Sequence, residues 1–101
     1  MSRTQTALVQ ECVTTKTTMR KYHKPRIINR KLGREGAWGQ YEPGTRTIEL
    51  DPRMSPQRSL GILVHESLHH LQPDMSESAV EVTAARLARI LWEQDYRKVH
   101  Q

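Results

Sequence analysis

Cysteine, aromatic residues and long apolar runs are all scarce in this chain. Cys12 is the only cysteine, Phe is absent, and apolar residues make up 36% of the 101 residues. A single cysteine excludes an internal disulfide bond and is typical of a reducing compartment, so we expect a cytoplasmic protein. No apolar stretch approaches the roughly 18 residues of a membrane span, and the N-terminus has no apolar signal-peptide core. We therefore expect no membrane association.

The small apolar fraction also limits the number and size of domains. A chain of 101 residues supports one compact domain. Its beginning has few apolar side chains and several threonines, which predicts a weakly ordered segment at 1–24. Residues 25–101 are then the single expected domain. A core this small gains from a bound metal, because ligand bonds add folding free energy.

Positive charge is concentrated in one stretch. The net charge is +5, and residues 16–34 contain eight cations and no acid, which leaves 8 basic and 11 acidic residues elsewhere. The eight cations are Lys16, Arg20, Lys21, Lys24, Arg26, Arg30, Lys31 and Arg34. Such a stretch indicates nucleic acid or an acidic partner, or it is a solvated strand and tail. Tyr22 is its only aromatic residue and no nucleic-acid-binding motif is present, so both interpretations stay open.

One motif carries chemistry. The segment from His65 to His69 reads H-E-x-x-H, within apolar residues at helical spacing: Leu60, Leu63, Val64, Leu68 and Leu71. On a helix, residues four apart share a face, so both imidazoles can bind one zinc ion. The adjacent Glu66 can reach a zinc-bound water and act as its general base. The alternative is a surface helix with incidental histidines.

The elements around this motif can be predicted from turn and capping signals. Alternation predicts strands at 26–30, 38–42 and 46–51, with a turn at Pro43-Gly44-Thr45, and hence a small antiparallel sheet of about three strands. Ser55 and Pro56 are typical of a helix start, and Pro73 ends that helix near residue 71. A second helix, from about 76 to 96, packs through Val80, Ala84, Leu87, Ala88 and Leu91. The short connection predicts antiparallel helices in an α+β domain.

A catalytic zinc site needs a third protein ligand. Antiparallel packing about the Pro73 turn places Glu77 opposite His69 and Glu81 opposite His65, and the two glutamates share one helical face. We therefore expect Glu77 to bind the metal and Glu81 to hold the imidazole of His65. The other candidate ligands are Asp74, His70, His23 and His100. Alternatively, Glu77 forms a capping box with Asp74, and Glu81 is a plain surface residue.

These residues resemble those of a known family. His65–His69 followed by Glu77-Ser78-Ala79-Val80-Glu81 is similar to the gluzincin arrangement, and the spacing from Glu77 to Ala84 resembles the E-x-x-A-N-x-x-A pattern of ImmA/IrrE-like peptidases. The resemblance to minimal gluzincins of phages and bacteria covers about residues 26–96. It implies a minimal zincin fold, with the glutamate after the motif helix as the third zinc ligand. Glu81 stands where the family usually has Asp or Asn.

The sequence and the resemblance together predict a zinc metallopeptidase that hydrolyses peptide or protein substrates with Glu66 as general base. Tyr41 or Tyr96 can offer a phenol to the oxyanion, and an edge strand at 38–42 can align an extended peptide. The rival hypothesis is a zinc-stabilised binding module, catalytically weak or inactive, whose basic segment 16–34 contacts nucleic acid or an acidic partner. A latent peptidase, in which residues 1–24 cover the cleft, is a further alternative. The oligomeric state, monomer or dimer, also stays open.

Overall fold

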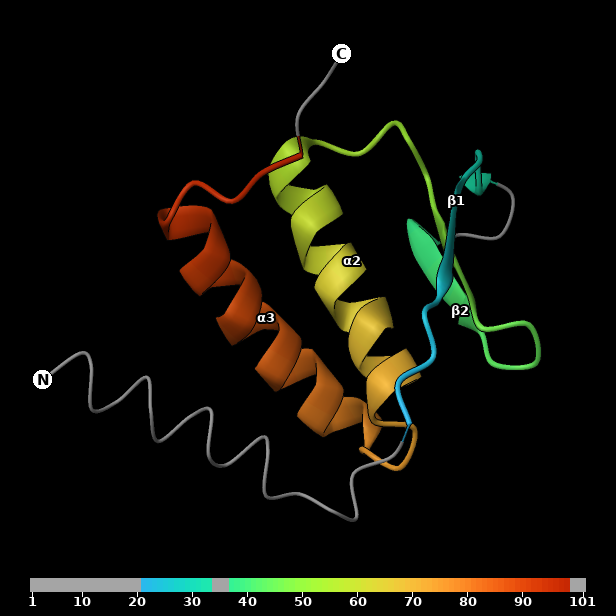
Figure 1. Ribbon diagram of the computed structural model, residues 1–101. Helices are drawn as coiled ribbons and strands as arrows, with labels where there is room; N and C mark the ends of the chain where they lie inside the picture. Colours follow the sequence, from blue (N-terminus) through green and yellow to red (C-terminus); the bar gives the residue numbers. More distant parts are fainter. Residues whose placement is uncertain (1–20, 34–36, 99–101) are drawn as a thin grey trace, which may run out of the picture.

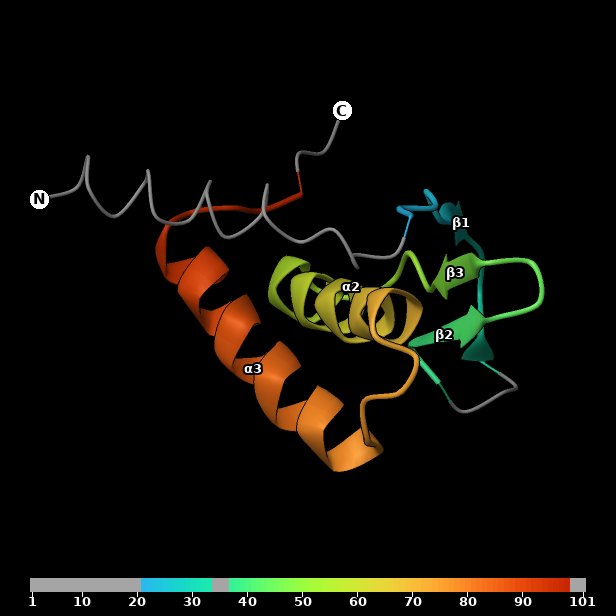
Figure 2. The same ribbon diagram turned by 60° about the horizontal axis from the view of Figure 1, so that its bottom comes forward.

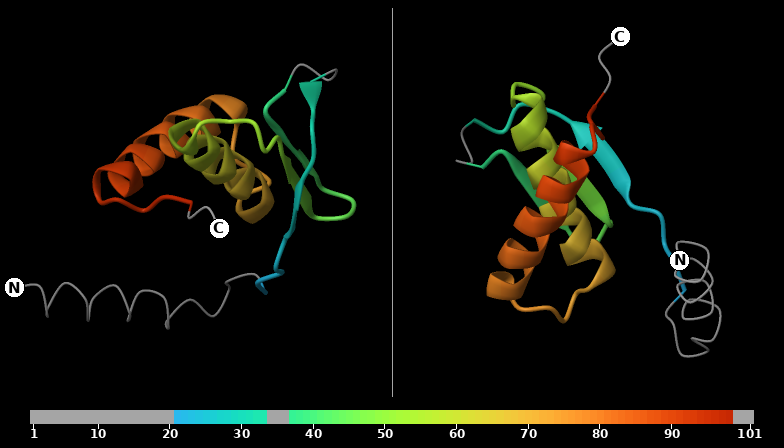
Figure 3. Two further views of the ribbon diagram at one scale, coloured as in Figure 1. Left: turned by 90° about the horizontal axis from the view of Figure 1, so that it is seen from above. Right: turned by 90° about the vertical axis from the view of Figure 1, so that its left-hand side faces the viewer.

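The computed structural model describes residues 21–33 and 37–98 (Figure 1). Its elements are β1 (Arg26–Asn29), β2 (Gly39–Glu42), β3 (Thr47–Leu50), α2 (Pro56–Leu71) and α3 (Glu77–Glu93). Figures 2 and 3 show that α2 lies between the sheet and α3. This is the α+β fold that the sequence predicts: a three-stranded sheet and two antiparallel helices. Of the segment 1–24, which the sequence predicts to be weakly ordered, residues 1–20 lie outside the described residues.

The sheet is mixed, whereas the sequence predicts an antiparallel one. Its order is β1-β3-β2, with β2 antiparallel and β1 parallel to β3. The strands do alternate in direction along the chain, but β3 inserts between the other two. Ile48 and Leu50 of β3 are almost fully buried, at 0% and 5% exposure, while β1 is mostly exposed. The most apolar strand therefore takes the centre, where neighbours cover both its edges.

The core lies between the sheet and α2. Ile48, Leu50 and Met54 form its buried cluster, and Tyr41, Ile62 and Leu63 pack against it. On the other side of α2, Val80 and Ala84 of α3 are buried, as predicted. Leu87, which the periodicity also places on that face, is 40% exposed. The contacts of α3 are with α2 and none are with the sheet, so only a narrow strip of α3 is covered.

Serine residues begin both helices. The Ser55 hydroxyl accepts a hydrogen bond from the Arg58 N–H, and Pro56 takes the first helical position, as predicted. In α3 the Ser76 hydroxyl accepts from the Ala79 N–H at 3.2 Å, so Ser76 is the cap and Asp74 is not. The capping-box alternative for Glu77 is therefore wrong, because Glu77 is the first residue of α3. The helix ends at Glu93, shortly before Asp95, whose φ of 65° is incompatible with continuing it.

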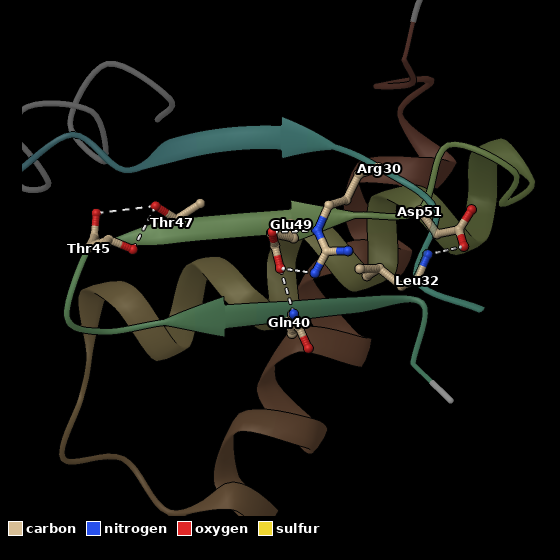
Figure 4. Close-up of polar contacts among 7 residues, drawn as sticks. All are labelled: Arg30, Leu32, Gln40, Thr45, Thr47, Glu49 and Asp51. Carbon is tan, nitrogen blue, oxygen red and sulfur yellow. Dashed lines mark hydrogen bonds and ion pairs between the residues drawn. The ribbon is translucent and has the colours of Figure 1, made fainter. Parts of the chain in front are cut away.

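A polar chain links all three strands on the sheet face that no helix covers (Figure 4). Glu49, at the centre, accepts hydrogen bonds from Arg30 Nε at 2.7 Å and from the Gln40 side-chain amide. These donors lower the pKa of the Glu49 carboxyl, with Arg30 contributing most. They tie the ends of β1 and β2 to β3, so this outer face holds the edge strands in position without an apolar layer.

Two glycines should respond in opposite ways to alanine. A Cβ at Gly39 would overlap with Ile62 Cγ2 of α2, and it would lie 3.2 Å from the Glu49 carbonyl oxygen. We expect Gly39→Ala to lower the free energy of unfolding by about 1–3 kcal/mol, the usual cost of overpacking. Gly61 lies inside α2 with open space around its Cα. Gly61→Ala should therefore stabilise the protein by about 0.5–1 kcal/mol, through helix propensity. Urea unfolding measures both, and equal effects of the same sign would contradict the packing of β2 on α2.

Asp51, directly after β3, bonds to the segment that follows β1 and to the segment that follows β3. Its carboxylate is 1% exposed and accepts hydrogen bonds from the Leu32 N–H at 3.0 Å, the Arg53 N–H at 3.0 Å and the Arg53 guanidinium at 2.6 Å. These bonds, the Arg53 side chain first, hold the pKa of the carboxyl well below its ordinary value. Figure 4 shows the bond to Leu32.

This arrangement predicts a stability that depends on pH. A carboxyl with a depressed pKa stabilises the fold above its ordinary pKa, and the contribution disappears as the pH falls, since the unfolded chain then binds more protons. Asp51→Asn should therefore lower the melting temperature strongly at pH 7, and the difference from the wild type should shrink below about pH 4. Glu93→Gln, which removes an exposed ion pair with Arg89, is the control and should change the melting temperature little. A difference in melting temperature between Asp51→Asn and the wild type that is as large at pH 2 as at pH 7 would contradict the depressed pKa of Asp51.

Candidate metal centre

His65 and His69 lie one turn apart on the face of α2 that borders a cavity. Their Nε2 atoms are 3.2 Å apart and their rings meet edge to face, with centroids separated by 4.9 Å. Each side chain is about one quarter exposed, at 23% and 28%. The i, i+4 spacing and the apolar anchoring of α2 against the sheet thus direct both imidazoles to one point, as the sequence predicts.

The third residue comes from the start of α3. The five-residue connection 72–76 reverses the chain, so that Glu77 faces the histidines across the helix pair. Its Oε1 atom lies 3.1 Å from His65 Nε2 and 3.3 Å from His69 Nε2. The three residues expected to bind metal are therefore brought together, and among the described residues they are the one such group.

The geometry of this group fits a tetrahedral metal ion. Ligand atoms about 2.0–2.1 Å from a tetrahedral zinc are about 3.3 Å from one another. The three separations here are 3.1, 3.2 and 3.3 Å. Two imidazole nitrogens and one carboxylate oxygen are also the donor set of many catalytic zinc sites, and three protein ligands leave one position open. The donor atoms and their spacing thus fit zinc.

Glu66 lies beside the first histidine and is far more buried than the three candidate ligands. It is 8% exposed, yet it lines the same cavity as His65, His69 and Glu77. Burial raises the pKa of its carboxyl, while nearby His65 and His69 act in the opposite direction. Its carboxylate makes no hydrogen bond or ion pair with any residue that the structure describes. A buried carboxylate of raised pKa that is open to the cavity can accept and return a proton.

The cavity is large enough for a peptide segment. Its volume is about 1200 Å³, and its walls are β2, the second half of α2, the start of α3 and residues 21–23. Since β2 is at the edge of the sheet, Gly39, Gln40 and Tyr41 line the cavity from an unpaired strand edge. The candidate metal-binding group, which consists of His65, His69 and Glu77 and is called the metal-binding group below, is therefore reached through an open cleft and is not enclosed in the core.

Tyr41 and His70 form a second pair that sequence reasoning did not foresee. The Tyr41 hydroxyl lies 2.8 Å from His70 Nδ1, and His70 Nε2 lies within hydrogen-bond distance of the His23 carbonyl oxygen. A carbonyl can only accept, so Nε2 carries the proton and Nδ1 accepts from the tyrosine. His70 is therefore no metal ligand. The only signal for the pair was proximity of His70 to the motif, because its partners are 29 and 47 residues away.

None of the remaining candidate ligands that the structure describes belongs to the metal-binding group. Glu81 is exposed, one turn beyond Glu77, and makes no hydrogen bond or ion pair with His65. Asp74 is not a member of the group. Of the two candidate phenols, Tyr41 lines the cavity, whereas Tyr96 is 65% exposed and does not. His100 and the basic residues 16–20 lie outside the described residues.

The described part of the chain gives no sign of a membrane segment, because none of its helices is long and apolar enough to cross a bilayer. It does bring together two imidazoles, a carboxylate ligand and a second, buried carboxylate at one cleft. Any functional assignment depends on this geometry and on the sequence motif. No protein-family model, curated protein or solved structure matches the chain.

Proposed function

We propose that this protein is a zinc-dependent peptidase of the gluzincin type. His65, His69 and Glu77 hold the metal, and Glu66 is the general base. The observation that carries the proposal is the set of 3.1–3.3 Å separations between three ligand atoms, in a cleft that also contains the buried Glu66 carboxylate. The resemblance of the motif and of Glu77 to minimal gluzincins supports the same assignment of roles.

The residues divide the work of peptide hydrolysis between them. Zinc, when bound, supplies a water molecule whose pKa is lowered toward neutrality. The Glu66 carboxylate accepts a proton from the attacking water and passes it to the leaving amine. Burial raises the pKa of this carboxyl in the metal-free chain, which helps it to take up a proton, and a zinc ion beside it would act in the opposite direction. Glu66 thus serves both proton transfers.

The cleft favours an extended peptide as substrate. The free edge of β2 borders it, so a peptide can add to the sheet through backbone hydrogen bonds while its scissile carbonyl faces the metal-binding group. A peptide or a flexible protein segment fits this geometry. With one cysteine in the whole sequence, we place the protein in the cytoplasm.

A zinc-stabilised binding module is the rival function. A structural zinc site normally has four protein ligands, whereas this group has three. A structural site also has no use for a buried carboxylate with no described partner, which costs stability. Both features favour catalysis.

Metal content is the decisive first measurement. We expect about one zinc per purified chain, and in Glu77→Ala a zinc affinity lower by about a hundredfold, since even partners behind the ligands contribute 10–100-fold. Glu81→Ala, an exposed glutamate one turn further along α3, is the matched control and should keep full affinity. Mass spectrometry and competition with a chromophoric chelator give both values.

The contrary result is equally clear. If the protein takes up no zinc after reconstitution, the peptidase proposal is wrong. Binding of a DNA duplex by the basic segment, with its salt dependence, is then the next measurement.

A further inference from the structure

The cleft that contains the metal-binding group is also lined by positively charged side chains. They are Lys21 and Arg46. Apart from the histidines, the other ionisable side chains in the lining are the carboxylates of Glu66 and Glu77 and the phenols of Tyr22 and Tyr41. The two glutamates have roles in the proposed catalysis. The charge that the proposed catalysis leaves available to a substrate in this cleft is therefore positive.

Backbone contacts fix the chain at or close to both cations. The bond from His70 to the His23 carbonyl fixes the chain two residues after Lys21 against the end of α2. The Arg26 N–H donates to the Arg46 carbonyl oxygen at 2.9 Å, which fixes Arg46 against β1. Arg46 also has a φ of 53°, the left-handed conformation that closes the turn between β2 and β3. The two side chains thus project from segments with defined positions.

Neither cation has a partner among the described residues. Other arginines of the domain do form ion pairs: Arg30 with Glu49, Arg53 with Asp51, Arg89 with Glu93, and Arg97 with Asp95. Both Lys21 and Arg46 are exposed, and unpaired surface cations are common in general. What distinguishes these two is that they border one cleft together with Glu66 and the metal-binding group.

We propose that Lys21 and Arg46, which line this cleft, bind a carboxylate of the peptide substrate. The inference rests on the proposed peptidase function and adds a substrate class to it. The carboxylate belongs either to an acidic side chain or to the C-terminus of the peptide. Charge-assisted hydrogen bonds from two exposed cations should contribute about tenfold to binding, less than at a buried site.

Labelled octapeptides test the proposal. One set carries a single Glu at successive positions in a neutral background, and its partner set carries Gln, each with a free or an amidated C-terminus. We expect one position at which Glu raises kcat/KM about tenfold over Gln, mainly through KM, because the contact is remote from the reacting bond. The preference should shrink as the ionic strength rises from 0.05 M to 0.5 M. A gain from the free C-terminus instead of Glu identifies the terminal carboxylate as the ligand.

Variants locate the effect. Lys21→Gln combined with Arg46→Asn removes both charges, and Asn tolerates the positive φ at position 46. This double variant should lose the carboxylate preference while it still cleaves the Gln peptides. Lys31→Gln is the matched control, because Lys31 belongs to the same basic stretch but does not line the cleft. It should keep the preference.

Binding of the carboxylate can be tested separately from peptide cleavage. The same peptides are titrated into the Glu66→Gln protein and binding is followed by fluorescence anisotropy, which needs no turnover. Tighter binding of the carboxylate peptides that depends on Lys21 and Arg46 supports the subsite even if no peptide is cleaved. Equal binding of the Glu and Gln sets with both free and amidated ends, or a preference unchanged in the double variant, overturns it.

Discussion

Glu66→Gln is expected to lower peptide hydrolysis by about 10³–10⁴-fold, the upper range for loss of a general base, while the protein keeps its zinc. The amide has nearly the same shape as the carboxylate but cannot accept the proton of the attacking water. The proposed metal ligands, His65, His69 and Glu77, are unchanged in this variant. Steady-state kinetics on a cleaved peptide, with zinc content measured on the same samples, tests both halves of the expectation.

Glu81→Gln is the matched control for this experiment. It makes the same chemical change on an exposed site of α3, outside the metal-binding group. We expect kcat/KM within about twofold of the wild type, since surface changes away from a site rarely matter. An active Glu66→Gln protein would contradict the assignment of Glu66 as the base.

The same Glu66 variant should be more stable than the wild type in the absence of metal. Burial raises the pKa of Glu66 in the folded state, so the folded chain binds more protons than the unfolded one and stability falls as the pH rises. Glutamine has no charge to bury. The melting temperature of metal-free Glu66→Gln should therefore exceed that of the wild type at pH 7 and approach it near pH 4. Burial of the Glu66 charge thus lowers the stability of the fold, a cost that its proposed catalytic role explains.

His69→Ala should abolish zinc binding in the micromolar range and with it the stabilisation that zinc provides. A ligand that binds only the folded state stabilises it by about 2.7 kcal/mol at one hundred times its dissociation constant. For a domain with so few buried side chains, that is a large part of the total. Thermal melts with zinc and with a chelator should differ for the wild type and coincide for His69→Ala.

His70→Ala is the control for this second experiment. It removes the neighbouring imidazole, which bonds to Tyr41 and to the His23 carbonyl and contributes nothing to the metal-binding group. Its zinc-dependent rise in melting temperature should match that of the wild type. If His69→Ala keeps its zinc, the metal lies elsewhere and the assignment of His65 and Glu77 is wrong as well.

Local signals in the sequence were sufficient for the helices. Ser55, Pro56 and Pro73 mark the bounds of α2, because caps and prolines act within one turn of the chain. The cap of α3 was ambiguous, since Asp74 and Ser76 are both good N-caps. The structure selects Ser76, and this choice makes Glu77 the first residue of the helix.

The order of the strands could not be read from the sequence in the same way. β1 pairs with β3, about twenty residues further on, and not with its neighbour β2. Alternation predicts which residues of a strand share a face but not which strand lies beside it. That choice depends on which arrangement buries Ile48 and Leu50 most completely, a property of the assembled core.

The residues of the site also fall into those that local sequence predicts and those that only the tertiary structure brings together. The sequence alone determined the pair His65 and His69, with Glu66 between them, because a helix fixes the directions of residues within one turn. It also predicted Glu77, because a short connection leaves two helices little choice but to pack antiparallel. Only the tertiary structure placed Tyr41 against His70 and brought Lys21 and Arg46 to the lining of one cleft. Those neighbours come from segments far apart in the chain, and packing of the sheet on α2 decides where such segments meet.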